Sequence, residues 1–164
     1  MESRFPAALD SLPDIVDFCA GGMYSLCLTQ TGDIYSFGCN DKGAYGRDTF
    51  EDGSQFEPRK MNLPGKAVKI CVGHSHSACL LQGGRAFACG SFRNLHGKMG
   101  LTLEGNKWKP FNILPGVEAH DISSGTDHLV ILACNGNMFT IRCAEQGQLE
   151  RVPLRDAGGH KQFM

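Results

Sequence analysis

A 52-residue period in the glycines constrains the fold of this chain more than any other feature. The period recurs in two sets of three residues: Gly21, Gly73 and Gly125, and Gly32, Gly84 and Gly136. Paired glycines at a spacing in this range are typical of propeller blades, whereas helical repeats are generally shorter and lack alternating strands. We therefore predict an all-β fold, an incomplete β-propeller built from three blade-like repeats of 52 residues.

Each repeat is predicted to hold an inner strand that ends in glycine, a second apolar strand, a tight turn and an aromatic strand. In the first repeat these are residues 16–21, 25–28, 30–33 and 34–37. Glycine at the third position of the turn suits the left-handed backbone of a tight hairpin. We expect the inner strands to be partly buried, and the further strands of each blade to come from segments beside the long loops, such as residues 59–63.

The period also sets the predicted domain organisation. Residues 1–164 form a single partial propeller domain. Within it, residues 16–67 are the first repeat, residues 68–119 the second, residues 120–153 an incomplete third, and residues 154–164 a tail.

The eight cysteines of the chain are expected to be free thiols. Cys19 and Cys71 stand one period apart, as do Cys27 and Cys79, so these residues belong to the repeat as small buried strand residues. No C-x-x-C pair occurs, which removes the usual signature of a zinc ribbon or a redox site. Free thiols fit a reducing compartment, and the chain has no apolar run of signal or membrane-span length. We therefore predict a soluble, non-secreted protein.

Several segments resemble the repeat of the regulator of chromosome condensation family. They are residues 19–23 (CAGGM), 34–41 (IYSFGCND), 46–49 (GRDT), 90–93 (GSFR), 127–130 (DHLV) and 145–149 (EQGQL). The resemblance spans most of residues 16–153. It implies a β-propeller, seven-bladed in the family, that acts as a guanine nucleotide exchange factor for the small GTPase Ran. It further implies a nuclear protein, with the cytoplasm as the alternative, and no cofactor of its own.

The resemblance also implies where the GTPase is engaged. A hairpin wedge over residues 91–99 is similar to the element that the family pushes against the GTPase, and its candidate binding residues are Phe92, Arg93, Asn94, Leu95, His96, Gly97 and Lys98. Asp127 matches the family's exchange-critical acid. Its repeat equivalents are Met23 and Ser75, so the blade itself does not require a carboxylate there. The alternative interpretation is a turn-capping aspartate that accepts hydrogen bonds from nearby backbone amides.

Three departures from the family pattern weaken the functional expectation. His74, which we also assign to GTPase binding, replaces a family acid by a mostly neutral ring. Arg142, Ala144 and Glu150 stand where the family has glycine, so we expect a looser third blade. Three repeats where the family uses seven leave outer blades uncovered, so we expect marginal stability or self-association through exposed blade edges.

A second hypothesis therefore stands beside exchange activity. It is a propeller-type module that binds proteins or chromatin, with histones or the nucleosome as partners, and that lacks exchange activity because of its truncation.

Three other interpretations are disfavoured. A metal site at His74 and His76 lacks a third ligand. A cysteine hydrolase using Cys89 or Cys143 would need an activated thiol, yet both lie in repeat strands. Trp108, between two lysines in the loop before the third repeat, could stack on nucleic acid, but packing between blades explains it better.

Overall fold

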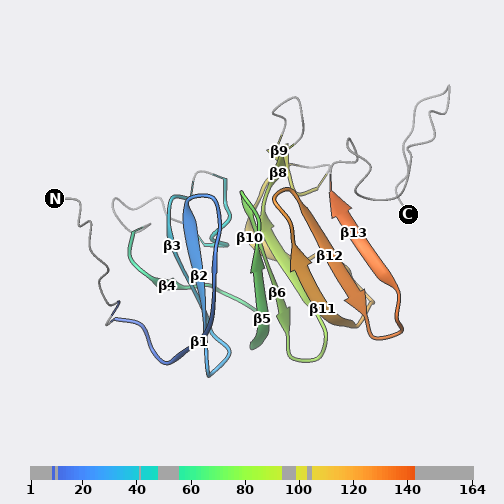
Figure 1. The fold of residues 1–164 in the computed structure, drawn as a ribbon, viewed down its shortest axis with the longest axis horizontal. Coiled ribbons are helices and arrows are strands. Elements are labelled where there is room, and N and C mark those ends of the chain that lie inside the picture. The colour runs from blue at the N-terminus through green and yellow to red at the C-terminus, as the bar shows by residue number, and fades with distance from the viewer. Residues whose placement is uncertain are drawn as a thin grey trace.

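A computed structural model describes residues 9, 11–40, 42–47, 56–93, 99–102 and 105–142 of the chain. Its regular structure is entirely β: three antiparallel sheets stand side by side, each a twisted blade (Figure 1). No helix that could cross a membrane occurs in these residues. The all-strand, partial-propeller prediction is thus confirmed.

The first two blades have four strands each. Blade one runs in the order β1 (Ile15–Ala20), β2 (Tyr24–Thr29), β3 (Ile34–Gly38) and β4 (Arg59–Lys60). Blade two contains β5 (Ala67–Val72), β6 (His76–Leu81), β7 (Ala86–Gly90) and β10 (Lys107–Asn112), with β10 beside β7. The fourth strand of blade one comes from the segment expected from the sequence. In blade two the fourth strand is β10, which contains Trp108, so the prediction that this residue lies in a loop is wrong.

Blade three shows three strands in the part of the chain that is described. They are β11 (Ala119–Ser124), β12 (His128–Ala133) and β13 (Met138–Arg142), paired in that order. A separate two-stranded ribbon pairs β8 (Phe92–Arg93) with β9 (Met99–Gly100) and projects from the end of blade two (Figure 1).

The inner strands bring the blades together. Strand β5 contacts both β1 and β11, which places the first strand of every repeat on the inner side of the array. The predicted partial burial holds for β5 and β11, but β1 is exposed along most of its length, so the prediction is wrong for the first repeat. The reason is positional: Ile70 and Ile122 are covered by the preceding blade, whereas the equivalent Phe18 has no described blade before it and is 75% exposed.

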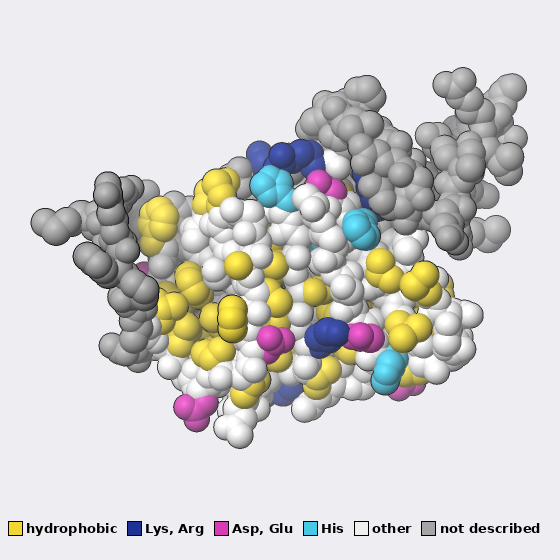
Figure 2. Space-filling view, viewed as in Figure 1, with side chains coloured by type: hydrophobic (Ala, Val, Ile, Leu, Met, Phe, Trp, Pro, Cys, Tyr) yellow, Lys and Arg dark blue, Asp and Glu magenta, His cyan; other side chains and the backbone are white. Residues whose placement is uncertain are grey.

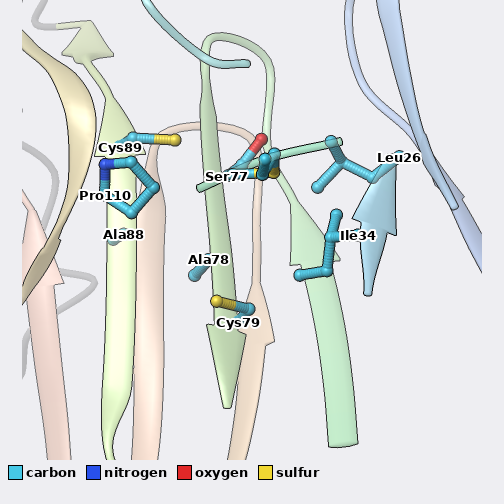
Figure 3. A pocket seen from close by; sticks show the side chains of 9 residues that line it. Leu26, Ile34, Ser77, Ala78, Cys79, Ala88, Cys89 and Pro110 are labelled. Atoms are coloured by element: carbon cyan, nitrogen blue, oxygen red, sulfur yellow. The ribbon is translucent and has the colours of Figure 1, made fainter. Parts of the chain in front are cut away.

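The core consists of two apolar layers, one in each interface between blades. In the first layer, Leu26 and Ile34 of blade one face Ser77 and Cys79 of blade two (Figure 3). The buried Ser77 hydroxyl in this layer is bonded, since its Oγ donates to the carbonyl oxygen of Ala44 at 2.6 Å. The second layer packs Leu80 of blade two and Phe92 of β8 against Ile122, Leu129 and Ile131 of blade three. Burial of these side chains is the main force holding the blades together.

The two sets of repeat glycines meet different structural needs. Gly32, Gly84 and Gly136 have φ values of +79°, +75° and +84°, the left-handed backbone that a tight hairpin turn uses. The other set, which includes Gly73, has no positive φ and is instead crossed closely by an aromatic ring three residues later in the chain.

The end of blade three departs from the other two. Gly38 and Gly90, at the ends of β3 and β7, have φ of +119° and +96°, and a Cβ on either would lie within 2.6 Å of a carbonyl oxygen. Arg142 takes the equivalent place and pairs with His128, as Gly38 pairs with Tyr24. Its Nε and Nη1 atoms are buried without a hydrogen-bond partner in the described part of the chain. Ala144 and Glu150, the other departures, lie outside the described residues.

The described cysteines are free thiols, as expected: Cys19, Cys27, Cys39, Cys71, Cys79, Cys89 and Cys134. Burial raises the pKa of Cys79 to about 12 and raises that of the fully buried Cys89 further. Cys89 therefore stays a neutral thiol at physiological pH, which argues against its use as a nucleophile. Cys143 lies outside the described residues.

Candidate functional site

The turns between the first and second strands of the blades meet at one end of the array. Gly22 of blade one donates its N–H to the carbonyl oxygen of His74 in blade two at 3.3 Å, and His74 donates to Thr126 of blade three at 2.8 Å. These three residues stand one period apart, so one backbone contact is repeated from blade to blade. The turns are thereby fixed relative to one another, and so are the side chains they carry.

Asp127 lies in the last of these turns, directly before β12. One carboxylate oxygen of this partly exposed residue accepts a solvent-exposed hydrogen bond from the backbone N–H of Arg93 at 2.9 Å. Arg93 belongs to β8, which follows blade two. The structure therefore brings the predicted acid to the base of the predicted wedge, although 34 residues separate them in the chain.

The base of the β8–β9 hairpin is held by blade two as well. Ser91 donates its N–H to the carbonyl oxygen of Ser75 at 2.8 Å. The Phe92 side chain is 1% exposed and meets the ring of His76 edge-on, with 4.5 Å between the ring centroids. The candidate residues Asn94, Leu95, His96, Gly97 and Lys98 lie outside the described residues. The structure describes the root of the hairpin, in which Phe92 is a core residue and Arg93 is exposed.

His76 is a buried neutral histidine beneath this root. Its side chain is fully buried, and its Nε2 lies 3.2 Å from Ser124 Oγ of blade three. Burial lowers the pKa of His76 to about 4, although the charge of Asp127 acts in the opposite direction. The imidazole is therefore uncharged at neutral pH and acts as a packing residue.

His74 lies in the turn before β6, with its ring against Gly22 of blade one. A Cβ added at Gly22 would fall 2.3 Å from its Nδ1. His74 and His76 thus contact different neighbours and do not form a pair of ligands on one strand edge. No group of three or more potential metal ligands occurs among the described residues.

Sequence reasoning missed a charged contact between the inner strands. Lys69 of β5 forms an ion pair with Asp121 of β11. Asp17 occupies the same repeat position in β1, so the charge alternates in sign from blade to blade. That alternation at one repeat position is the signal that could have predicted the contact.

Trp108 packs against a neighbouring loop. A Cβ added at Gly43, which follows β3 of blade one, would lie within 3.1 Å of the Trp108 indole. The contact joins the outer strand of blade two to blade one. It favours packing between blades, the interpretation preferred from the sequence, although the side chain remains 42% exposed.

Antiparallel blades that pack side by side through their inner strands, with turn-borne polar groups gathered at one end, define a β-propeller-type repeat protein. The family model of the "Regulator of chromosome condensation (RCC1) repeat" matches residues 31–80. Together with the relatives described next, this match shows that the chain belongs to the regulator of chromosome condensation family.

The relatives cover nearly all of this chain. The regulator of chromosome condensation of Drosophila melanogaster is 55% identical over 97% of the chain, and that of Xenopus laevis is 47% identical over 98%. The guanine nucleotide exchange factor SRM1 of Saccharomyces cerevisiae is 28% identical over 84%. The chain spans only 29%, 39% and 35% of the length of these three proteins, respectively.

A solved structure has the same fold. The crystal structure of Prp20p from Saccharomyces cerevisiae, a protein with binding properties towards Gsp1p and histones, superposes with a TM-score of 0.77. It is 29% identical, and the match covers 84% of this chain and 34% of Prp20p.

Proposed function

We propose that the chain acts as a guanine nucleotide exchange factor-like protein on the small GTPase Ran. In this proposal the β8–β9 hairpin is inserted against the GTPase, and Asp127 helps to stabilise the nucleotide-free state. Two relatives support it: SRM1, which is named a guanine nucleotide exchange factor, and Prp20p, which has binding properties towards Gsp1p. The single observation that carries the proposal is that Asp127 and the root of the hairpin are hydrogen-bonded neighbours.

The chemistry is that of differential binding. A small GTPase holds its nucleotide through backbone amides, a lysine and Mg²⁺ around the phosphates. A hairpin that displaces these elements, with the carboxylate of Asp127 at its base, lowers the free energy of the empty GTPase. Because a partner shifts an equilibrium only by its differential affinity, the chain must bind empty Ran more tightly than nucleotide-bound Ran. No covalent step is involved.

His74 would contribute to the contact from the neighbouring turn. Its half-buried ring against Gly22 holds it at the same end of the blades as Asp127. An imidazole in place of a family acid lacks the negative charge that attracts a basic GTPase surface, so we expect His74→Asp to strengthen binding. Such a protein would act in the nucleus, where chromatin is its second partner.

The test is the release of labelled GDP from Ran. Ran loaded with a fluorescent GDP is mixed with excess unlabelled GTP, with and without micromolar chain. An accelerated, concentration-dependent release supports the proposal. A GDP release rate equal to that of Ran alone would contradict the proposal of exchange activity.

A chromatin-binding module without exchange activity is the second candidate, favoured by the histone binding of Prp20p. In a pull-down with core histones, retention at about 0.15 M salt, combined with no effect on GDP release, would establish this second function in place of the first.

A further inference from the structure

We infer that Asp127 is a positioning residue: its carboxylate fastens the β8–β9 hairpin, which grows from blade two, onto blade three. We call the hydrogen bond from the Arg93 N–H to the Asp127 carboxylate the tie. Its relevance to nucleotide exchange rests on the proposed function, whereas its existence does not.

The hairpin needs support from outside. In the part of the hairpin that the structure describes, β8 and β9 pair Phe92 with Gly100 and Arg93 with Met99. An isolated two-stranded hairpin is at best marginally stable in water. The direction of a two-stranded ribbon therefore depends on contacts between its base and the rest of the protein.

Blade two fixes the first part of β8. The backbone bond from Ser91 to Ser75 and the burial of Phe92 against His76 hold the point at which the hairpin leaves the blade. Both contacts precede Arg93 in the chain. They hold the point at which the hairpin leaves the blade, and the buried side chain of Leu101, directly after β9, holds the point at which it returns.

Asp127 supplies a contact from a different direction. Successive N–H groups of a strand point to opposite sides, and the N–H of Arg93 points away from the hairpin toward Asp127. The acceptor belongs to blade three, so β8 is held from two blades at once. A hydrogen bond to an ionised carboxylate is stronger than a neutral one.

The repeat shows that this contact is an addition to the ordinary blade. The carbonyl oxygens of Met23 and Ser75, the equivalents of Asp127, accept hydrogen bonds from Cys39 and Ser91 within their own blades. The turn thus already ties each of these blades internally through its backbone. The side chain of Asp127 adds a bond between blades, and its direction is toward the hairpin.

Two substitutions separate positioning from charge. Asp127→Asn removes the charge but keeps an oxygen that can accept from Arg93, while Asp127→Ala removes both. Asp121→Ala is the matched control, since Asp121 also reaches from blade three to blade two but pairs with Lys69, away from the hairpin. Circular dichroism checks that all three variants fold.

Amide hydrogen exchange of Arg93, measured by NMR on the full chain, reads the tie without any GTPase. We expect about tenfold faster exchange in Asp127→Ala, about threefold or less in Asp127→Asn, and no change in Asp121→Ala. Equal protection of Arg93 in the parent chain and in folded Asp127→Ala would overturn the inference.

The rate of GDP release supplies the second readout. We expect Asp127→Ala to lose most of the acceleration and Asp127→Asn to regain a measurable part of it. An Asn variant as inactive as the Ala variant, with Arg93 still protected, would show that the charge acts on the GTPase directly, and would overturn positioning as the role in exchange. If the parent chain does not accelerate GDP release but Arg93 shows the expected amide pattern, the proposed function is wrong. The inference that Asp127 holds the hairpin would still be supported.

Discussion

The imidazole of His76 crosses directly over Gly73, so closely that a Cβ in place of the glycine hydrogen would fall 2.0 Å from its Cε1. The same relationship joins Gly125 to His128 and Gly21 to Tyr24, at 2.0 and 2.3 Å. In each pair the glycine donates its N–H to the carbonyl oxygen of the aromatic residue at 2.8 or 2.9 Å. The 52-residue glycine period therefore records a close approach between ring and backbone.

Substitution of Gly73 should be costly because the ring cannot move away within a packed core. We expect Gly73→Ala to lower the free energy of unfolding by about 2 kcal/mol or more, measured by urea denaturation. Gly83→Ala is the control: Gly83 has a φ of +83° but no atom within 4 Å of an added Cβ, so only backbone strain of about 1 kcal/mol is expected. Equal losses in the two variants would contradict the steric explanation.

The stability of the chain should fall in mild acid because of His76. The folded-state pKa of about 4 lies below the ordinary 6.5, so below pH 6.5 the unfolded chain binds a proton that the folded chain does not. The contribution of His76 is fully present above pH 6.5, declines as the pH falls, and is lost near pH 4; its upper limit is about 3 kcal/mol.

The measurement is urea unfolding between pH 4 and pH 7. His76→Tyr, which places the residue of the first repeat in the second, removes the titrating group and should flatten the pH dependence. A slope that persists unchanged in this variant would assign the effect to other groups.

Core and surface positions of the same strand should respond differently to truncation. Ile131 is fully buried between blades two and three, whereas Leu132, its neighbour in β12, is 38% exposed. We expect Ile131→Ala to cost about 2–5 kcal/mol and Leu132→Ala well under 1 kcal/mol in chemical denaturation. A larger loss at Leu132 would mean that the open side of blade three is covered in solution.

Thiol reactivity should follow burial. Cys134 is exposed at the β12–β13 turn, while Cys79 and Cys89 are buried with raised pKa values. With a mild alkylating agent at pH 7.5, we expect Cys134 to react first, and Cys79 and Cys89 to react only after unfolding. Mass spectrometry of digests gives the order, and early labelling of Cys89 would contradict the packing between blades one and two.

Self-association should depend on the open face of blade one. Phe18 is 75% exposed, although its equivalents Ile70 and Ile122 are 3% and 1% exposed, and hydrophobic side chains gather over blade one (Figure 2). We expect Phe18→Ser to weaken concentration-dependent association in analytical ultracentrifugation, with His120→Ser, an exposed substitution on β11, as the control. A parent chain that remains monomeric at high concentration would remove this expectation.

The strands and their turns were predictable because they depend on local chemistry. The apolar runs, the aromatic strand after each turn and the positive φ at Gly32 follow from residue types at fixed spacing. The position of Trp108 in a strand was not predictable. Strand β10 forms by pairing with β7, and nothing in the residues of β10 specifies that partner.

The candidate site divides in the same way. The carboxylate of Asp127 was expected from the family resemblance, and its repeat equivalents, Met23 and Ser75, are uncharged, so the blade itself does not require it. That this carboxylate accepts a hydrogen bond from Arg93 could not be predicted, because the bond depends on how far blade three is rotated against blade two.

The sequence by itself determined the period, the strand-forming segments and the turns, since each follows from backbone preferences and side-chain alternation within a few residues. Only the tertiary structure decided which inner strands are buried, why Gly73 must be glycine, and which groups meet at the end of the blades. These features arise where side chains 30 to 50 residues apart are pressed together, and the contacts there depend on the geometry of packing between blades.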